Sequence, residues 1–316
     1  MDYLRNICQE KGVFLRAEAI GVGYDDRALA RLRRGGEVRR VSHGAYTFAD
    51  LWEAADERTR HGWLARAAYR TAKADVALSH VSGVLEHTTA HWGLDLSAAH
   101  LTRLDGHAGR RGRGSHQHRG RILEGDVVKV NGVQATAPVR ACLELTTVAG
   151  VEASLVSVNA MLNAEKCTLP ELRARYERSI EYWPSTLATD LVLRLADPRI
   201  SSVGETRSFH LLWRSGFPAP IPQYEVRDER GRVVAIVDFA WPELGIFLEF
   251  DGKVKYQALL KEGEDPGDVV VREKRREDLV RRLTGWKCLR LVWADLEKPE
   301  RTVAWLRREF TVASAA

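Results

Sequence analysis

Two carboxylates stand inside apolar stretches that a short turn joins, and this pattern constrains the C-terminal part of the chain. The stretch VVAIVDFAW carries Asp238 late in its run, and IFLEFDG carries Glu249 late in the next. Both stretches are rich in β-branched and aromatic residues, which is typical of strands. A charge inside such a strand is costly without a partner. The two acids therefore depart from the pattern of a purely structural sheet.

The segments around these two strands have a definite order. A helix is predicted to begin near Glu205, and QYEV predicts a first strand before the two acidic ones. A charged helix ending at Gly285 and a closing strand, KCLRLVWADL, are predicted to follow. Helix, three-stranded meander, helix and strand is the topology of restriction endonucleases. We therefore expect an α/β restriction-endonuclease-like core at residues 200–316.

Adjacent antiparallel strands can bring Asp238 and Glu249 to one end and one face of the sheet. Two carboxylates held in this way bind a hard divalent cation, Mg²⁺ or Mn²⁺. Such an ion activates a water molecule and stabilises charge on a scissile phosphate. Glu205, at the start of the preceding helix, is a candidate further ligand. The alternative is that these acids are turn formers at strand ends.

A lysine is also needed near such a site, to orient the water or to offset charge in the transition state. The position two residues after Glu249 is where these nucleases carry it, and Asp251 stands there. Asp251 is then another candidate metal ligand. We expect Lys255 to be the displaced lysine, with Lys274 on the charged helix as the alternative.

The chain has 316 residues, which is too long for one ordinary core. We expect an α+β multidomain protein with a winged helix-turn-helix at 1–50, a mixed helical and β middle domain at 51–199, and the nuclease-like domain at 200–316. No apolar run approaches the ~18 residues that span a bilayer, and the first residues do not form a signal peptide. A cytoplasmic protein with no membrane partner is expected.

The N-terminal residues follow the order of a winged helix. Asp25 offers an N-cap for the basic helix RALARLRR, which the Gly35-Gly36 pair stops. EVRRVSHGAYTF then alternates around a turn at His43-Gly44, which indicates a β-ribbon. In a winged helix the second helix of the motif enters the major groove of DNA and the wing touches the backbone.

Arginine greatly outnumbers lysine and gathers in three places, which favours a polyanionic partner because its planar fork donates bidentately to phosphate. The alternatives are solvated helix faces and, for the winged helix, a protein-binding module. DNA contacts are predicted at Arg27, Arg31, Arg34, Arg39, Arg40, Lys274 and Arg275.

The middle region mixes two patterns. Residues 51–100 are rich in alanine with helical spacing, whereas the pattern of 98–138 indicates strands around a glycine-arginine segment, 105–121. This segment is either a loop that contacts phosphates or a mobile surface loop, and we favour the second interpretation. An Asn131-Gly132 turn predicts a hairpin. His80, His87 and His91 have spacings that can share a helix face, but Gly83 interrupts them, and no metal site is expected there.

These residues resemble a known group. VDFAWPELGIFLEFDGKVKY and EKRREDLVRRLTGWKCLRLVWADL look like the C-terminal region of actinobacterial AbiEi-family antitoxin-domain proteins. That region is similar to the very-short-patch-repair-like branch of the PD-(D/E)XK nucleases. GEVRRVSHGAYTF resembles the wing of the AbiEi antitoxins, and LSHVSGVLEH resembles the middle of the same proteins. The resemblance implies acidic metal-site positions at Asp238, Glu249 and Asp251, with Lys255 as their basic partner.

The expected function is that of a DNA-binding, Mg²⁺-dependent endonuclease that hydrolyses phosphodiester bonds and is targeted by its winged helix. The resemblance also implies a second possibility, because AbiEi antitoxins are transcriptional autorepressors that neutralise a nucleotidyltransferase toxin. The alternative is then a non-catalytic DNA-binding regulator of the antitoxin type. A third interpretation is that the winged helix holds a toxin protein.

Overall fold

The structure, a computed structural model, describes residues 1–252 and 276–314. The chain divides into two units, Met1–Ala196 and Asp197–Ala316. The boundary predicted between residues 199 and 200 lies near this division, whereas the one predicted between 50 and 51 lies inside the first unit. Within the described ranges, no helix has the length and apolar character that crossing a membrane requires.

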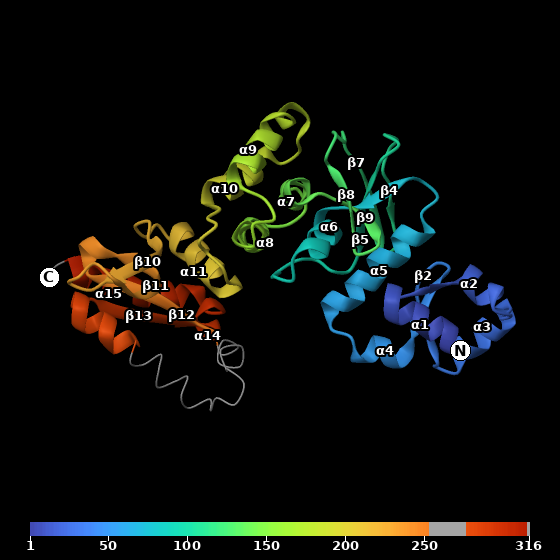
Figure 1. The fold of residues 1–316 in the computed structure, drawn as a ribbon, viewed down its shortest axis with the longest axis horizontal. Helices are drawn as coiled ribbons and strands as arrows, with labels where there is room; N and C mark the ends of the chain where they lie inside the picture. Colours follow the sequence, from blue (N-terminus) through green and yellow to red (C-terminus); the bar gives the residue numbers. More distant parts are fainter. Residues whose placement is uncertain (253–275, 315–316) are drawn as a thin grey trace. The chain divides into compact units, whose positions relative to one another are not determined.

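The first unit begins with three helices, α1, α2 and α3 (Figure 1), and a small antiparallel sheet in which β3 is the middle strand. Helix, turn, basic helix and ribbon is the order that the sequence predicts. The first strand, only two residues long, was not predicted, because it is defined by its pairing with β3 rather than by a local pattern. The elements are α1 (Asp2–Lys11), β1 (Phe14–Leu15), α2 (Arg16–Gly21), α3 (Asp26–Arg34), β2 (Val38–Ser42) and β3 (Ala45–Phe48).

The start of α3 is fixed as predicted. The carboxylate of Asp25 accepts a hydrogen bond from the backbone N–H of Ala28 at 2.7 Å, which satisfies one of the orphan donors of the first turn. Leu29 on the inner face of α3 packs with Leu4 and Phe14, so the helix is held against the small sheet by its apolar stripe.

The remainder of the first unit surrounds a six-stranded sheet with the order β6-β7-β5-β4-β9-β8. The predicted hairpin at Asn131-Gly132 is confirmed, since β8 and β9 pair across it. The strands are β4 (Val76–Leu78), β5 (Ala99–Arg103), β6 (Arg111–Gly112), β7 (Ser115–Arg119), β8 (Val127–Val130) and β9 (Val133–Thr136).

The structure differs from the sequence interpretation of this region in two places. The segment expected to be mostly helical contains, besides three helices, the strand β4, whose three residues are buried between β5 and β9. The segment expected to be a mobile loop contains β7, which pairs in parallel with β5 over five residues. The SHQHR sequence of β7 has no apolar residue, so its strand depends on backbone pairing rather than on hydrophobic alternation.

Helices pack on and beside this sheet. Thr168 and Glu171 form a capping box at the start of α9, and Pro138 stands at the start of α7. The helices are α4 (Ala49–Ala54), α5 (Glu57–Thr71), α6 (His80–His87), α7 (Pro138–Leu145), α8 (Val151–Asn163), α9 (Leu169–Glu177) and α10 (Thr186–Leu195), with a 3-10 turn at Ile180–Tyr182.

The second unit has the predicted succession of a helix, three antiparallel strands, a helix and a further strand. The sheet order is β10-β11-β12-β13, with β12 and β13 parallel. Two helices that the sequence analysis did not place follow β13. The elements are α11 (Val203–Arg214), β10 (Ile221–Arg227), β11 (Val233–Trp241), β12 (Ile246–Asp251), a helix at 276–284, β13 (Lys287–Val292), α14 (Trp293–Leu296) and α15 (Pro299–Ser314).

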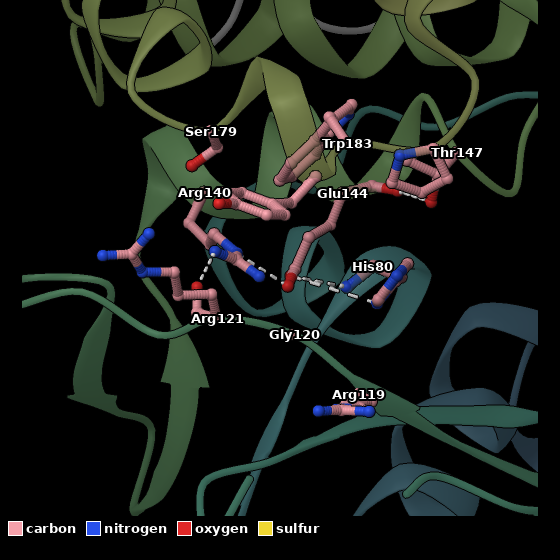
Figure 2. Close-up of a pocket in the computed structure, with 11 residues that line it drawn as sticks. His80, Arg119, Gly120, Arg121, Arg140, Glu144, Thr147, Ser179 and Trp183 are labelled. Carbon is pink, nitrogen blue, oxygen red and sulfur yellow. Dashed lines mark hydrogen bonds and ion pairs between the residues drawn. The ribbon is translucent and has the colours of Figure 1, made fainter.

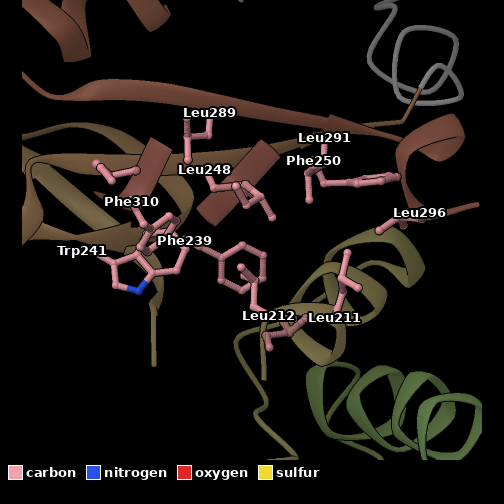
Figure 3. Packing of buried hydrophobic residues seen from close by; sticks show 13 residues of the cluster. Leu211, Leu212, Phe239, Trp241, Leu248, Phe250, Leu289, Leu291, Leu296 and Phe310 are labelled. Atoms are coloured by element: carbon pink, nitrogen blue, oxygen red, sulfur yellow. The ribbon is translucent and has the colours of Figure 1, made fainter. Parts of the chain in front are cut away.

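The core of the second unit lies between one face of the sheet and the helices α11, α14 and α15 (Figure 3). Phe239 and Trp241 of β11 contribute large buried side chains, and the indole N–H of Trp241 donates to the carbonyl of Pro218 at 2.9 Å. Gly204 lets α11 approach closely, since a Cβ there would lie 1.9 Å from a ring carbon of Phe250. Helix α11 therefore packs tightly against β12.

Candidate functional site

Three arginines project from the outer face of α3. At about 100° per residue, Arg27, Arg31 and Arg34 fall in one narrow sector of the helix. The buried Leu29 and the half-buried Leu32 lie on the opposite side, and all three arginines are exposed. The face that α3 turns away from its own core is therefore cationic.

The wing continues this basic surface. Between residues 27 and 40 the chain has six arginines and one glutamate. Arg39 lies over the ring of Trp52 at 5.0 Å, and Arg40 donates to the carbonyl of Ser42 at 3.2 Å. The Arg40 guanidinium also lies 2.8 Å from the Nδ1 atom of His43 at the tip of the hairpin. These contacts orient both wing arginines without neutralising them.

In the second unit the carboxylates of Asp238 and Glu249 belong to neighbouring strands. The antiparallel pairs of β11 and β12 end at Phe239 opposite Leu248, so the next position along the same register sets Asp238 against Glu249. The ladder stops there because the Asp238 carboxylate accepts the backbone N–H of Phe250 at 2.8 Å. Both acids are half-buried at this end of the sheet.

Arginines from outside these strands accompany the acids. Arg276 donates to the carboxylate of Glu249 at 2.7 Å and to the carbonyl of Ile236, also at 2.7 Å. Arg290 of β13 lies 3.7 Å from the carboxylate of Asp251 and is also ion-paired with Glu277. This part of the sheet therefore carries a network of alternating charge.

Glu205 is almost completely buried, at 1% exposure. Its carboxylate accepts hydrogen bonds from the Ser202 hydroxyl at 2.7 Å and the Ser201 backbone N–H at 3.2 Å, and the Gln223 amide lies 3.4 Å away. These partners lie at the start of α11 and on β10. These contacts are those of a residue that closes the first turn of its helix.

Three predicted site residues, Lys255, Lys274 and Arg275, lie outside the described residues. Among residues 1–252 and 276–314, three histidines form a group that could hold a metal ion. One ligand atom each from His80, His100 and His118 lies within 4.8 Å of those of the other two. The carboxylates predicted as metal ligands do not form such a group in this arrangement. Their role in metal binding stays a prediction.

The sequence analysis missed a pocket in the first unit, which charged and aromatic side chains line together (Figure 2). The pocket has a volume of about 490 Å³ including its open mouth, and His80, Arg140 and Glu144 line it together with Trp183. Arg140 donates to Glu144 at 2.8 Å, and its guanidinium lies 5.3 Å from the Trp183 ring. The sequence did contain a signal that could have pointed to this pocket. Arg140 and Glu144 are opposite charges four residues apart in an otherwise apolar helix, a spacing at which the two side chains can pair with each other.

The comparison with known proteins concerns the N-terminal segment. No curated protein matches the chain. Residues 1–49 match the family model described as "Transcriptional regulator, AbiEi antitoxin". This range covers α1 to β3, the helices and strands that carry the cationic face of α3 and the wing. The N-terminal domain of this chain is therefore similar to the DNA-binding domain of the AbiEi antitoxin regulators.

Proposed function

We propose that this protein is a DNA-binding transcriptional regulator of the AbiEi antitoxin type, which places α3 in the major groove and its wing against the backbone. The observation that carries the proposal is the exposed face of Arg27, Arg31 and Arg34, which lies opposite the buried face of α3. A recognition helix needs this separation, because one side must pack on its own domain while the other contacts base edges and phosphates.

The proposal predicts a graded loss of affinity. Fluorescence anisotropy with labelled duplexes from the gene's own promoter region, and with a random duplex, measures binding as salt is raised. Arg31→Ala and Arg34→Ala should each weaken binding, and each lost phosphate contact should reduce the slope of log K against log salt by about 1. Arg33→Ala is the matched control, because Arg33 lies on the same helix but outside this sector.

The result that would contradict the proposal is equally specific. If Arg33→Ala weakens DNA binding as much as Arg31→Ala does, then the overall positive charge of the helix, and not this face, is responsible for the affinity. Failure of the intact protein to bind any duplex at low salt would favour the interpretation in which the winged helix holds a protein partner such as a toxin.

A second candidate function is metal-dependent cleavage of DNA by the second unit, and the juxtaposition of Asp238 and Glu249 favours it. Their carboxylate oxygens, with those of Asp251, are the donors that Mg²⁺ or Mn²⁺ prefers. When bound, the ion would activate water and stabilise charge on the phosphate. Asp238 is oriented by the Phe250 N–H, whereas Glu249 would have to exchange Arg276 for the ion.

Plasmid cleavage tests this second function. Supercoiled DNA is incubated with the intact protein and Mg²⁺ or Mn²⁺, and nicked and linear products are measured. Asp238→Ala and Glu249→Ala should abolish cleavage, and Glu243→Ala should not, because Glu243 is exposed in the turn between the same two strands. Cleavage that persists in both Asp238→Ala and Glu249→Ala would contradict the assignment of these acids to the site. If the intact protein binds its promoter but cleaves no DNA, the result would favour the regulator.

A further inference from the structure

Three histidines from separate elements meet in the interior of the first unit. His80 begins α6, His100 lies on β5 and His118 on β7. One ligand atom from each lies within 4.8 Å of those of the other two. Because β5 and β7 are parallel and pair His100 with His116, His118 lies diagonally from His100 on the same face of the sheet.

The facing nitrogens are nearly at metal-binding separation. Nδ1 of His100 lies 2.9 Å from Nε2 of His118, a distance at which the two rings share one proton. With Zn–N bonds of about 2.0–2.1 Å, two ligand nitrogens of a tetrahedral site lie about 3.3 Å apart. An ion can therefore take the place of the shared proton if the two rings separate by roughly half an ångström and the donating ring carries its proton on its other nitrogen.

The ring positions lead to the same conclusion, with one adjustment. Ring centroids are 5.1 Å apart for His100 and His118 and 5.7 Å apart for His80 and His100. Tetrahedral zinc with three imidazole ligands places centroids about 5.3 Å apart, given the same bond length. His80 and His118 are instead stacked at 3.7 Å, so metal binding requires this stack to open.

The second nitrogen of His80 already has partners of the kind that orient a metal ligand. Its Nδ1 atom lies 2.9 Å from the Ser79 hydroxyl and 3.9 Å from the Glu144 carboxylate, which leaves Nε2 for a metal. Burial lowers the pKa of His100 to about 3 and that of His118 to about 4. These rings are thus neutral at pH 7, and neutral imidazole is the form that coordinates metals.

We propose that His80, His100 and His118 bind a divalent transition-metal ion of the zinc class in the first unit. Three imidazoles suit zinc, and a nearby carboxylate, Glu144, balances part of its charge. His80 also lines the pocket of Figure 2, so that the pocket gives access to the fourth coordination position. The exposed Arg121 at the rim of this pocket makes water or an anionic group the expected fourth ligand.

Cobalt is the probe, because tetrahedral Co²⁺ absorbs strongly in the visible range and octahedral Co²⁺ on carboxylates absorbs weakly. The untagged full-length protein is stripped with EDTA, dialysed and titrated with Co²⁺, and then with Zn²⁺. The expected result is one equivalent of intensely absorbing Co²⁺, which one equivalent of Zn²⁺ displaces. Mass spectrometry of the metal content should give one zinc per chain after growth in zinc-supplemented medium.

Variants assign the ion to this cluster. His80→Asn and His118→Gln should each weaken Co²⁺ binding at least about 100-fold, since even partners outside the coordination sphere are worth about 10–100-fold. His80 has a backbone φ of +51°, a left-handed conformation that asparagine tolerates, so His80→Asn is expected to fold. His116→Gln is the matched control, because His116 is half-buried on the same strand but outside the group.

Circular dichroism shows that each variant is folded before its affinity is compared. Asp238→Ala should keep the full absorption, which separates this site from the carboxylates of the second unit. Absence of intense Co²⁺ absorption in the wild-type protein overturns the proposal. Absorption that persists in folded His80→Asn, or that disappears in Asp238→Ala, overturns it as well.

Discussion

Replacement of Asp126 by asparagine tests how the buried charges of the first unit hold its helices on the sheet. Asp126 is 4% exposed. Its two carboxylate oxygens accept hydrogen bonds from Arg175 at 2.7 and 2.6 Å, and one of them also accepts from Arg140 at 3.2 Å. Arg140 is shared with Glu144, so two buried positive and two buried negative groups balance one another.

The expected loss follows from this balance. Asparagine keeps the shape of the side chain but leaves one buried guanidinium without its counter-charge. Removal of one partner of a buried pair destabilises proteins by about 3–5 kcal/mol. This loss is a large share of the free energy of unfolding of a typical domain, which is about 5–15 kcal/mol. Asp105→Asn is the matched control, because Asp105 also pairs with an arginine, Arg103, but at the surface, where little change is expected.

The same change predicts a pH dependence. Burial alone would raise the pKa of Asp126, but the hydrogen bonds from Arg175 outweigh it and hold the pKa below its usual range. A carboxylate with a lowered pKa stabilises the fold above its unfolded-state pKa of about 3.9, and this stability is lost as pH falls through the folded-state pKa. The stability difference between wild type and Asp126→Asn should therefore narrow below about pH 4.

Urea unfolding at several pH values, with hydrogen exchange and mass spectrometry to identify peptides of the first unit, measures both effects. The reasoning is refuted if Asp126→Asn costs no more than Asp105→Asn at pH 7. It is also refuted if the free energies of unfolding of wild type and Asp126→Asn fall in parallel from pH 7 to the acid limit.

Two further changes test packing and helix ends. Gly204→Ala should destabilise the second unit by about 1–3 kcal/mol, because the added Cβ would meet the Phe250 ring. Gly62→Ala in α5, where nothing lies within 4 Å of the added carbon, should stabilise its unit by up to about 1 kcal/mol. Hydrogen exchange at increasing urea concentration measures the unfolding midpoint of each unit. The two predictions are contradicted if Gly204→Ala and Gly62→Ala shift the midpoint of their units in the same direction. Thr168→Ala should cost about 1 kcal/mol through loss of the capping box at α9, measured as a lower unfolding midpoint.

Local signals were sufficient for the basic helix and the β-ribbon of the N-terminal domain and for the Asn131-Gly132 hairpin. Asp25 caps α3 through the N–H of Ala28, only three residues away, and the Asn131-Gly132 turn joins two strands that are adjacent in sequence. Such contacts are encoded within a few residues. The alternation of apolar residues around Asp238 and Glu249 likewise predicted their strands and their common end of the sheet.

Non-local contacts explain what the sequence analysis missed. β4 is three residues long and buried on both faces, so it shows no alternation and was absorbed into the surrounding helical pattern. β7 is a strand because β5 pairs with it, although its own residues are polar. The histidine group was missed for the second of these reasons, since His100 and His118 come together only because β5 and β7 are neighbours. His87, by contrast, donates its Nε2–H to the carbonyl oxygen of Thr136 at 2.8 Å and does not join the group.

The buried charges of the two units differ in a way that bears on their functions. The side chains of Asp126 and Arg140 are only 5% exposed, so loss of this buried network is expected to unfold local structure. The pair of Glu249 and Arg276 is more open, with side-chain exposures of 14% and 31%. An ion pair near the surface is weakened by solvent, at an effective dielectric constant of about 20. The proposed exchange of Arg276 for a divalent ion would therefore cost less than the removal of a partner from the buried network, and this is the physical reason to test metal-dependent chemistry at Glu249.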